Sequence, residues 1–364
     1  MTRQLRLTVS TLLACTLASA AHAAGPASPP EGLRFQHHDW VVACDNTRTC
    51  RVAGYQPEPD ELSISLLLTR EAGPNQPVQA RLTLGDYGSE AESASAPALA
   101  QRKLNLRVNG KAMGALPWLA QHQSFGLTAA QLQAVLKALP RAEALIEFTH
   151  GPNVWRLSDQ GAAAVLLKMD EAQGRIGTPG ALVRRGSRPE SQALPPLPMP
   201  VVKAAPVPEL LKGRAAEQAL GLSPQAMAAL RQELTDNAGD NQDPDLQDGP
   251  DNPLTFAPLG HGKWLVSRLC WRAAYNEGYC MWVMNERPPH QLQLVTESAS
   301  DHTQGVIMSS QKGRGLGDCW GHEEWTWDGR AFVHTAARTT GLCRLVTPGG
   351  AWDLPTRVTR VIRP

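Results

Sequence analysis

Three groups of residues in this sequence have types and spacings that could support chemistry. The first is acidic: Asp243, Asp245 and Asp248 lie close together, and carboxylate oxygens are the ligands that Ca²⁺ prefers. Gln247 stands where a calcium loop needs its third ligand, and Gly249 comes one position late. A solvated loop is therefore the preferred interpretation. Calcium at these three aspartates stays an alternative, and no other cofactor is predicted.

The second group is aromatic and lies near the end of the chain. The Asp328-Gly329 dipeptide is typical of a type I′ hairpin turn. Closing the hairpin there would pair Trp327 with Arg330 and Trp325 with Phe332, on one face of the strands. Packing in a core, with Arg330 on Trp327, is the preferred interpretation. The alternative is an exposed face that binds a glycan or a peptide, because aromatic rings anchor such ligands.

The third group is the pair Glu323 and His334, which the same hairpin would place opposite each other. A facing carboxylate can raise the pKa of a histidine, although an ordinary cross-strand pair explains the pattern equally well. The neighbouring His322-Glu323-Glu324 is not a zinc-protease motif, because Thr326 replaces the second histidine. The sequence thus predicts no catalytic, cofactor-binding or metal-binding residue.

The start of the chain indicates export. Residues 1–24 are predicted to be a secretory signal peptide, because Arg3 and Arg6 precede an apolar stretch that ends at Ala21-His22-Ala23. A lipoprotein signal that leaves Cys15 lipidated is the alternative. No segment is long enough to cross a membrane as a helix, which takes about 20 apolar residues. The predicted location is therefore the periplasm or the medium.

Six cysteines follow the predicted signal peptide. An even number of cysteines in an exported chain favours disulfides, which persist in oxidising compartments. No Cys-x-x-Cys motif occurs, which disfavours a zinc ribbon or a thioredoxin-type redox pair. Proximity along the chain favours the following pairs: Cys44–Cys50, Cys270–Cys280 and Cys319–Cys343.

Charge excludes one class of partner. Removing residues 1–23 takes two Arg from 35 Lys and Arg, which leaves 33 against 34 Asp and Glu. A net charge near −1 gives no bulk attraction to nucleic acid. The partners expected are an envelope protein or a glycan.

The apolar patterns predict a mainly β protein with a few helices. Alternation before Asn109-Gly110 predicts a hairpin, and Thr128 with Gln131 predicts a helix through a capping box. Ser158 is predicted to be the N-cap of a second helix over 159–173. A third helix is predicted around 213–235. The predicted organisation is as follows: an N-terminal β-rich domain with two helices at 33–185, a Pro-rich linker or surface wrap with a short helix and an Asp-rich loop at 186–252, and a Trp-rich β domain at 253–364.

Several short motifs together resemble an uncharacterised proteobacterial periplasmic family catalogued as domain of unknown function 1176. They are Asp39-Trp40, the segment from Cys44 to Arg51, Gly54-Tyr55, Leu157-Ser158, Gly161, Met169-Asp170-Glu171, Gln173-Gly174-Arg175, Cys270, Ala274-Tyr275-Asn276, Gly317-Asp318-Cys319, Glu324-Trp325, Trp327-Asp328-Gly329 and Phe332. The opening from Phe35 to Cys44 is also similar to the N-terminal part of invasion-associated locus B-like proteins. The resemblance implies an exported envelope protein with β-sandwich-like parts, and it implies no activity. The predicted fold is mainly β with a few helices, in two disulfide-stabilised β-sandwich-like domains.

Three functions are consistent with these observations. The preferred hypothesis is a non-enzymatic binding or interaction module of the cell envelope, because no complete catalytic group is visible. The first alternative is an enzyme that acts on envelope substrates with a site assembled from distant residues. The second is a purely structural envelope protein.

Overall fold

The structure is a computed structural model, and it describes residues 32–58, 60, 62–85, 100–101, 103–209, 218–237, 239, 243, 246 and 252–364. Residues 31–364 cluster as one compact unit. The predicted signal peptide and Cys15 lie outside the described residues, as do Asp245 and Asp248. None of the described helices is long and apolar enough to cross a membrane.

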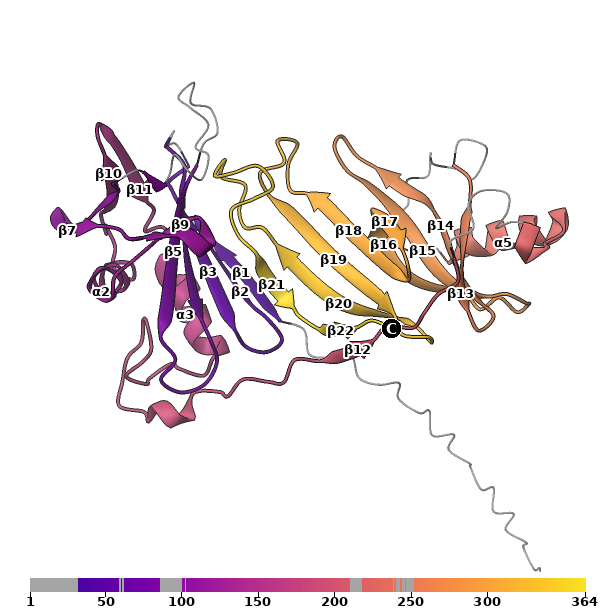
Figure 1. Cartoon of the computed structure of the whole chain (residues 1–364), viewed down its shortest axis with the longest axis horizontal. Helices are drawn as coiled ribbons and strands as arrows, with labels where there is room; N and C mark the ends of the chain where they lie inside the picture. The colour runs from indigo at the N-terminus through magenta and orange to yellow at the C-terminus, as the bar shows by residue number, and fades with distance from the viewer. Residues whose placement is uncertain are drawn as a thin grey trace, which may run out of the picture. The chain divides into compact units, whose positions relative to one another are not determined.

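The first half of the unit contains two antiparallel sheets (Figure 1). The seven-stranded sheet has, in spatial order, β1 (Leu33–His37), β2 (Trp40–Cys44), β3 (Cys50–Tyr55), β4 (Ile64–Arg70), β5 (Val78–Leu84), β9 (Ser124–Gly126) and β8 (Trp118–Leu119). The four-stranded sheet beside it has β11 (Asn153–Leu157), β10 (Ile146–His150), β6 (Asn105–Val108) and β7 (Lys111–Ala115).

The second half contains two further antiparallel sheets and a short parallel one. A four-stranded sheet is built from β13 (Thr255–Gly260), β14 (Lys263–Arg272), β15 (Glu277–Asn285) and β16 (Gln293–Ala299). A five-stranded sheet is built from β17 (Asp301–Thr303), β18 (Val306–Lys312), β19 (Trp320–Trp327), β20 (Phe332–Thr339) and β21 (Leu354–Arg357). The parallel pair is β12 (Val201–Lys203) with β22 (Arg360–Ile362). The predicted mainly β fold is confirmed.

The described helices are few and short. They are α2 (Ala129–Ala138), α3 (Ala162–Ala172), α5 (Pro224–Asp236) and the 3₁₀ turns η1 (Ala120–His122) and η2 (Glu190–Gln192). The capping box is confirmed, because Gln131 N–H donates to Thr128 Oγ1 and Thr128 N–H donates to Gln131 Oε1. The predicted N-cap Ser158 is wrong: α3 begins three residues later than expected, after Gly161 with φ +94°. A Cβ at Gly161 would collide with the carbonyl oxygen of His37, so glycine is required there.

The two predicted hairpin turns had different outcomes. Asn109 and Gly110 both have positive φ and join β6 to β7, as a type I′ turn requires. The register predicted at Asp328-Gly329 is wrong, because Trp327 pairs with Phe332 rather than with Arg330. The Asp328 carboxylate accepts the N–H groups of Arg330 and Ala331 at 2.8 Å, which moves the turn one residue along the chain.

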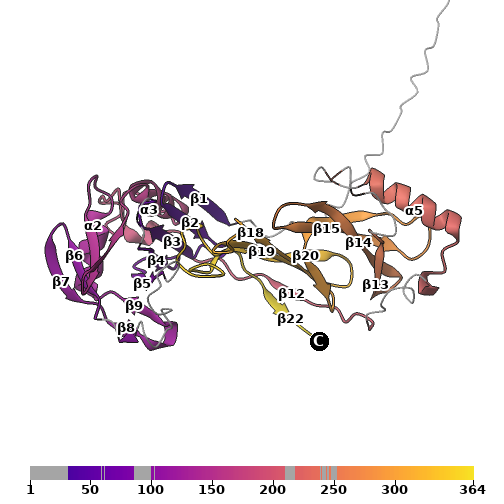
Figure 2. The same cartoon turned by 90° about the horizontal axis from the view of Figure 1, so that it is seen from above.

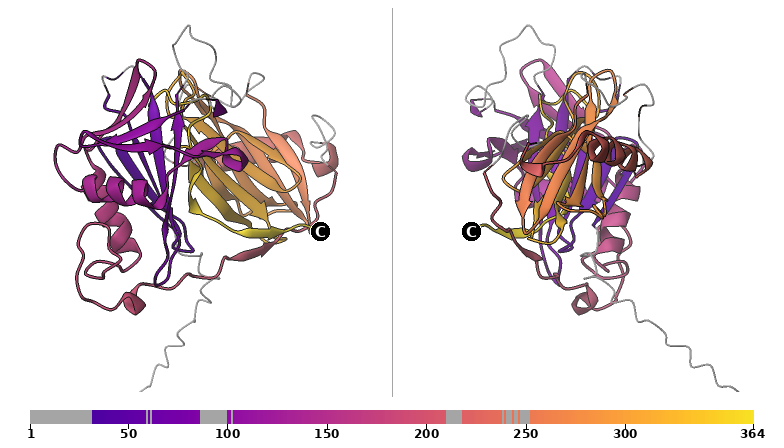
Figure 3. Two further views of the ribbon diagram at one scale, coloured as in Figure 1. Left: turned by 60° about the vertical axis from the view of Figure 1, so that its left-hand side comes forward. Right: turned by 90° about the vertical axis from the view of Figure 1, so that its right-hand side faces the viewer.

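The seven-stranded sheet is buried on both faces at its centre, which is why β2 and β4 are almost continuously apolar. Its first face packs against α2, α3 and the neighbouring four-stranded sheet in one large core. Its second face has a smaller apolar centre, where Tyr55 and Leu67 meet Val346 and Leu354 from the second half of the chain. Figure 3 shows the helices and the second half on opposite sides of this sheet.

The two larger sheets of the second half pack against each other. Leu265 and Val283 of the four-stranded sheet belong to the same buried cluster as Ile307, Trp325 and Trp327 of the five-stranded sheet. The outer face of the four-stranded sheet is covered by α5, as Figure 2 shows. The stack of α5 and two sheets explains why so many tryptophans occur in this part of the sequence: most of them fill these two interfaces.

Disulfides and main-chain hydrogen bonds hold these layers together. All three expected disulfides are present: Cys44–Cys50, Cys270–Cys280 and Cys319–Cys343. The Pro-rich segment runs along the surface of both halves, since Leu197 N–H donates to Thr47 O and Ala205 N–H donates to Trp327 O. The division into domains at 33–185 and 253–364, with 186–252 between them, stays a proposal about the organisation of the chain.

Candidate functional site

The aromatic residues singled out in the sequence are mainly part of a core. Trp327 is fully buried and Trp325 is 9% exposed, and both contribute to the interface between the two sheets of the second half. Phe332 is half-buried with its ring 5.3 Å from that of Trp327, and Arg330 is exposed in the turn. This placement favours the packing interpretation, and it leaves neither indole available as a platform.

The acidic candidates do not define a metal site among the described residues. Asp243 donates its N–H to Cys270 O, and its two predicted partners fall outside the described ranges. Asp318, Cys319 and Cys343 place potential ligand atoms within 4.8 Å of one another. The two sulfur atoms of that group form a disulfide, so they cannot act as thiolate ligands.

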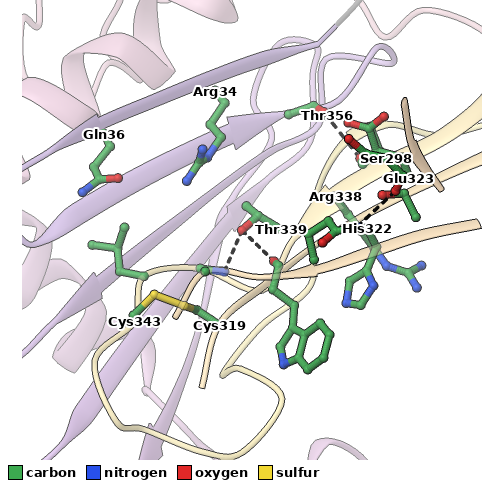
Figure 4. Close-up of a pocket in the computed structure, with 18 of the residues that line it drawn as sticks. Arg34, Gln36, Ser298, Cys319, His322, Glu323, Arg338, Thr339, Cys343 and Thr356 are labelled. Atoms are coloured by element: carbon green, nitrogen blue, oxygen red, sulfur yellow. Dashed lines mark hydrogen bonds between the residues drawn. A yellow bond between two sulfur atoms is a disulfide. The ribbon is translucent and has the colours of Figure 1, made fainter. Parts of the chain in front are cut away.

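A polar groove of about 740 Å³ lies where the second face of the seven-stranded sheet meets the five-stranded sheet (Figure 4). The lining residues come from distant parts of the sequence. They include Arg34 and Gln36 of β1, Glu58, Thr296 and Ser298 of β16, Ser309 and Gln311 of β18, Trp320, His322 and Glu323 of β19, Arg338 and Thr339 of β20, Arg344, Thr356 of β21 and the Cys319–Cys343 disulfide. We call this set the polar groove.

A change of polarity along one sheet face creates the groove. On β18 and β19 the cross-strand pair Ile307 and Trp325 is apolar and packs in the core. The next pair on the same face, Ser309 and Glu323, is polar and lines the groove. Because side chains alternate along a strand, this face is continuous with the core face, and it changes character within two residues. The interface between the sheets therefore ends in a hydrophilic recess.

Some polar groups in the recess lack protein partners. Gln311 Oε1 is buried without a hydrogen bond, although Gln311 Nε2 donates to Glu277 O and Ser298 O. Ser309 is 5% exposed, and its hydroxyl makes no hydrogen bond with a described residue. Buried polar groups are usually hydrogen-bonded, so Gln311 Oε1 indicates a place for water or a polar ligand.

The opposite wall carries both free and neutralised cations. Arg34 is exposed on β1 and makes no ion pair with any described residue, and Figure 4 shows it projecting beside Gln36. Arg344, in contrast, donates to Asp39 Oδ1 at 2.6 Å and lies 3.5 Å from Glu58 Oε2. The Arg344–Asp39 pair is nearly buried and joins the two halves of the chain, so its role is structural.

The rim of the groove carries an aromatic pair that the sequence analysis did not single out. Trp320 is half-buried, and its ring is parallel to that of His322 with centroids 6.0 Å apart. Lys312 Nζ lies 5.5 Å from the Trp320 ring, and His322 Nδ1 is 3.0 Å from Ser310 Oγ. Burial, and then the charge of Arg338, lower the pKa of His322, so this imidazole is neutral at pH 7.

The predicted pair of Glu323 and His334 does come together, although not as opposed residues. His334 pairs with Trp325 and stacks on its ring at 4.9 Å. A bulge in β20 shifts the strand, and His334 Nε2 lies 3.6 Å from Glu323 Oε2. Glu323 thus lies between the groove and the aromatic core.

A salt bridge supports the disulfide wall of the groove. Asp318 is 2% exposed, receives two hydrogen bonds from the Arg314 guanidinium and accepts the Leu345 N–H at 2.7 Å. Burial alone would raise the pKa of Asp318, but these hydrogen bonds together lower it below its usual value. The loop that contains Cys343 is thereby fixed next to Cys319.

Comparison with known proteins places the chain in a family. A family model described as "Protein of unknown function (DUF1176)" matches residues 34–359. The chain belongs to this family. It is also 26% identical over 330 residues to "Uncharacterized protein YpfG" of Escherichia coli strain K12, an alignment that covers 83% of this chain and 87% of that protein. No solved structure matches the chain. The likeness to invasion-associated locus B-like proteins stays a prediction.

The DUF1176 description assigns no reaction, so the groove must be interpreted from its own chemistry. Sequence reasoning missed Ser309, Gln311 and Thr339 because short polar residues in strands are ordinary surface residues. One signal was available: in β18, Ile307 is followed at alternate positions by Ser309 and Gln311, so one strand face changes from apolar to polar. Only the folded sheets show that this face points inward.

Proposed function

We propose that this DUF1176 protein is an exported, non-enzymatic binding module of the cell envelope that holds a glycan in the polar groove. Export is supported by the predicted signal peptide and by three disulfides, which persist in oxidising compartments. The main support for glycan binding is the inward sheet face of β18 and β19, which becomes polar at Ser309 and Glu323. Gln311 Oε1 is buried on the same strand without a hydrogen bond.

A glycan fits this chemistry better than an apolar ligand. Sugar hydroxyls can both donate and accept hydrogen bonds, which suits the hydroxyl, amide and carboxylate groups of the groove. The half-buried Trp320 at the rim can stack on the apolar face of a sugar ring. The proposal thus moves the aromatic contact from the buried Trp325 to the accessible Trp320.

The test uses the mature chain without residues 1–24 and two probes, N-acetylglucosamine oligomers and soluble peptidoglycan fragments. Calorimetric titration should show saturable binding to one of them. Trp320→Ala and Glu323→Gln should each weaken binding at least about tenfold, equivalent to 1.4 kcal/mol. The matched control Glu171→Gln changes an exposed carboxylate on α3 and should bind as the wild type does. Absence of binding to both probes would refute the glycan proposal.

One contact favours a second candidate, an enzyme that acts on envelope substrates. Ser310 Oγ lies 3.0 Å from Nδ1 of the neutral His322, which is the distance of a nucleophile and its base. No described carboxylate hydrogen-bonds the other nitrogen of His322, so the orienting group of a triad is missing. A fluorophosphonate probe should label wild type and not Ser310→Ala if this candidate holds. Equal labelling of both, or of neither, would exclude it.

A further inference from the structure

A second cavity of about 890 Å³ lies away from β1, beside the margin of the seven-stranded sheet that the first residues of β5 form, where Val78–Ala80 pair with no described strand beyond β5. Its charged lining residues are all basic: Arg51, Arg70, Arg81, Arg185 and the exposed His122. No aspartate or glutamate is among the described residues that line it. We call it the arginine cavity.

Two of the four arginines are neutralised from outside the cavity. Arg51 forms a 2.9 Å ion pair with the nearly buried Asp45. Arg70 donates to Gln76 O and Gly180 O, and it lies 4.0 Å from both Asp170 and Glu190. The excess positive charge of the cavity therefore belongs to Arg81 and Arg185.

Arg81 is the unusual residue. Its guanidinium lies 5.6 Å from the centre of the Trp352 ring, and that indole is fixed by a 2.7 Å hydrogen bond from Nε1 to Ser65 Oγ. Arg81 makes no hydrogen bond or ion pair with any described residue, although it is only partly exposed. Its five N–H donors therefore have no hydrogen-bond acceptor among the described residues. Burial, and then the charge of Arg51, lower the pKa of Arg81.

The cavity also has an apolar wall, beside the polar side chains of Thr69, Gln76, Gln79 and Gln133. The wall includes Leu119 of β8, Leu127 between β9 and α2, Leu132 and Leu136 of α2, and Leu182 in the loop after α3. Leu132, Leu136 and Leu182 pack on the large core of the first half, on the sheet face opposite to Arg81. The cavity joins the two faces at the edge of β5 formed by Val78–Ala80, which pairs with no described strand on this side, so a ligand that contacts both parts passes that edge. An inorganic anion would use only the arginines, and a hydrocarbon would use only the leucines.

We propose that the arginine cavity binds an amphipathic anion, whose carboxylate or phosphate lies at Arg81 beside Arg51 and whose acyl-sized apolar part lies on the leucine wall. The anion supplies the acceptors that Arg81 lacks, and a planar guanidinium binds a carboxylate or phosphate with two parallel hydrogen bonds. Charge repulsion between Arg51 and Arg81 falls when the anion is bound. The arginine cavity shares no lining residue with the polar groove, so the proposal is independent of glycan binding.

Isothermal titration of the mature chain with four probes below their micelle concentrations tests the proposal. Laurate and dodecyl phosphate are both amphipathic anions. Comparing their affinities shows whether the natural ligand is a fatty acid or a phosphorylated lipid. Inorganic phosphate has only the anionic group, and neutral dodecanol has only the apolar chain. We expect one saturable site for laurate or dodecyl phosphate, and at least about tenfold weaker binding of inorganic phosphate and of dodecanol.

The variants separate the two parts of the site. Arg81→Gln should weaken binding of the anionic amphiphiles at least tenfold, and Leu132→Asn should weaken it without affecting inorganic phosphate. Arg272→Gln, an exposed arginine of β14, is the matched control and should bind as the wild type does. Thermal unfolding checks that each variant folds, and Arg185→Gln replaces Arg81→Gln if the latter does not.

Several outcomes would overturn the proposal. The first is absence of saturable binding to both anionic amphiphiles, and the second is unchanged binding in Arg81→Gln and Arg185→Gln. Equal affinity for inorganic phosphate would show an anion site without an apolar part. Tighter binding of a Glu-rich peptide that displaces laurate would assign the cavity to a protein partner instead.

Discussion

Two margins of the seven-stranded sheet offer very different surfaces. At the β1 margin, cations such as Arg34 share the polar groove with Glu58 and Glu323 and with many hydroxyl and amide groups. At the β5 margin, arginines meet leucines, and no acid is among the described lining residues. Between the two margins lies the small apolar centre around Tyr55 and Leu67. The two proposed sites therefore require ligands of different chemistry.

The largest expected effect comes from breaking that apolar centre. Tyr55 is fully buried, its hydroxyl accepts the Leu342 N–H at 3.1 Å, and burial raises its pKa to about 12. Tyr55→Ala should lower the free energy of unfolding by about 3–5 kcal/mol, because it leaves a large cavity. Tyr55→Phe should cost only about 1–2 kcal/mol, the penalty of one unpaired N–H. Urea denaturation measures both. Equal losses would show that the ring does not hold the two halves together.

The disulfide at the β1 margin should come next. Cys319 and Cys343 are 24 residues apart, so replacing both by Ala should cost about 3 kcal/mol. The Cys44–Cys50 pair closes a loop with a separation of only 6 residues, and its removal should cost about 1 kcal/mol less. Titration should show weaker ligand binding in the polar groove and unchanged binding in the arginine cavity. Loss at both sites would contradict their independence.

Removing Arg344 should have a somewhat smaller effect. The Arg344→Ala variant leaves Asp39 almost buried without its partner, which should cost about 2–3 kcal/mol after allowance for partial exposure. Arg338→Ala is the control, because its 3.8 Å pair with Asp353 is largely exposed and should contribute less than about 1 kcal/mol. Thermal unfolding of the two variants compares them. A similar loss of stability in both variants would mean that the Arg344–Asp39 pair contributes no more than an exposed ion pair.

The smallest effect concerns the pH dependence of the β1 margin. Burial, and then Arg338, lower the pKa of His322 below its ordinary value of 6.5, so the unfolded chain binds more protons than the folded one below that pH. The stability contribution of neutral His322 is therefore present above about pH 6.5 and is lost as the pH falls. NMR titration should show a higher His322 pKa in Arg338→Gln than in wild type. An unchanged value would leave burial as the whole cause.

Features that depend on neighbouring residues could be predicted well. The capping box of α2 and the Asn109-Gly110 turn were predicted correctly, because each is decided by a few adjacent residues. The disulfide pairs also followed from proximity along the chain. The turn at Asp328 was wrong by one position, since the Asp328 carboxylate competes for main-chain N–H groups that a dipeptide rule ignores.

The candidate sites were much harder to predict. The sequence pointed to Trp325 and Trp327, but it could not show that they are buried while Trp320 is accessible. Arg81 is an ordinary strand arginine in the sequence. Its unpaired guanidinium becomes visible only when Trp352, 271 positions later, is found beneath it.

The sequence by itself determined the β-rich composition, the local disulfides and the family to which the chain belongs, because these depend on residue type and short-range spacing. The tertiary structure decided which strand faces are core and which are sites. Ile307 and Ser309 belong to the same face of one strand, and only the packing of distant sheets buries the first and leaves the second beside a groove. Burial and charge balance are properties of many segments together, so no single segment could reveal them.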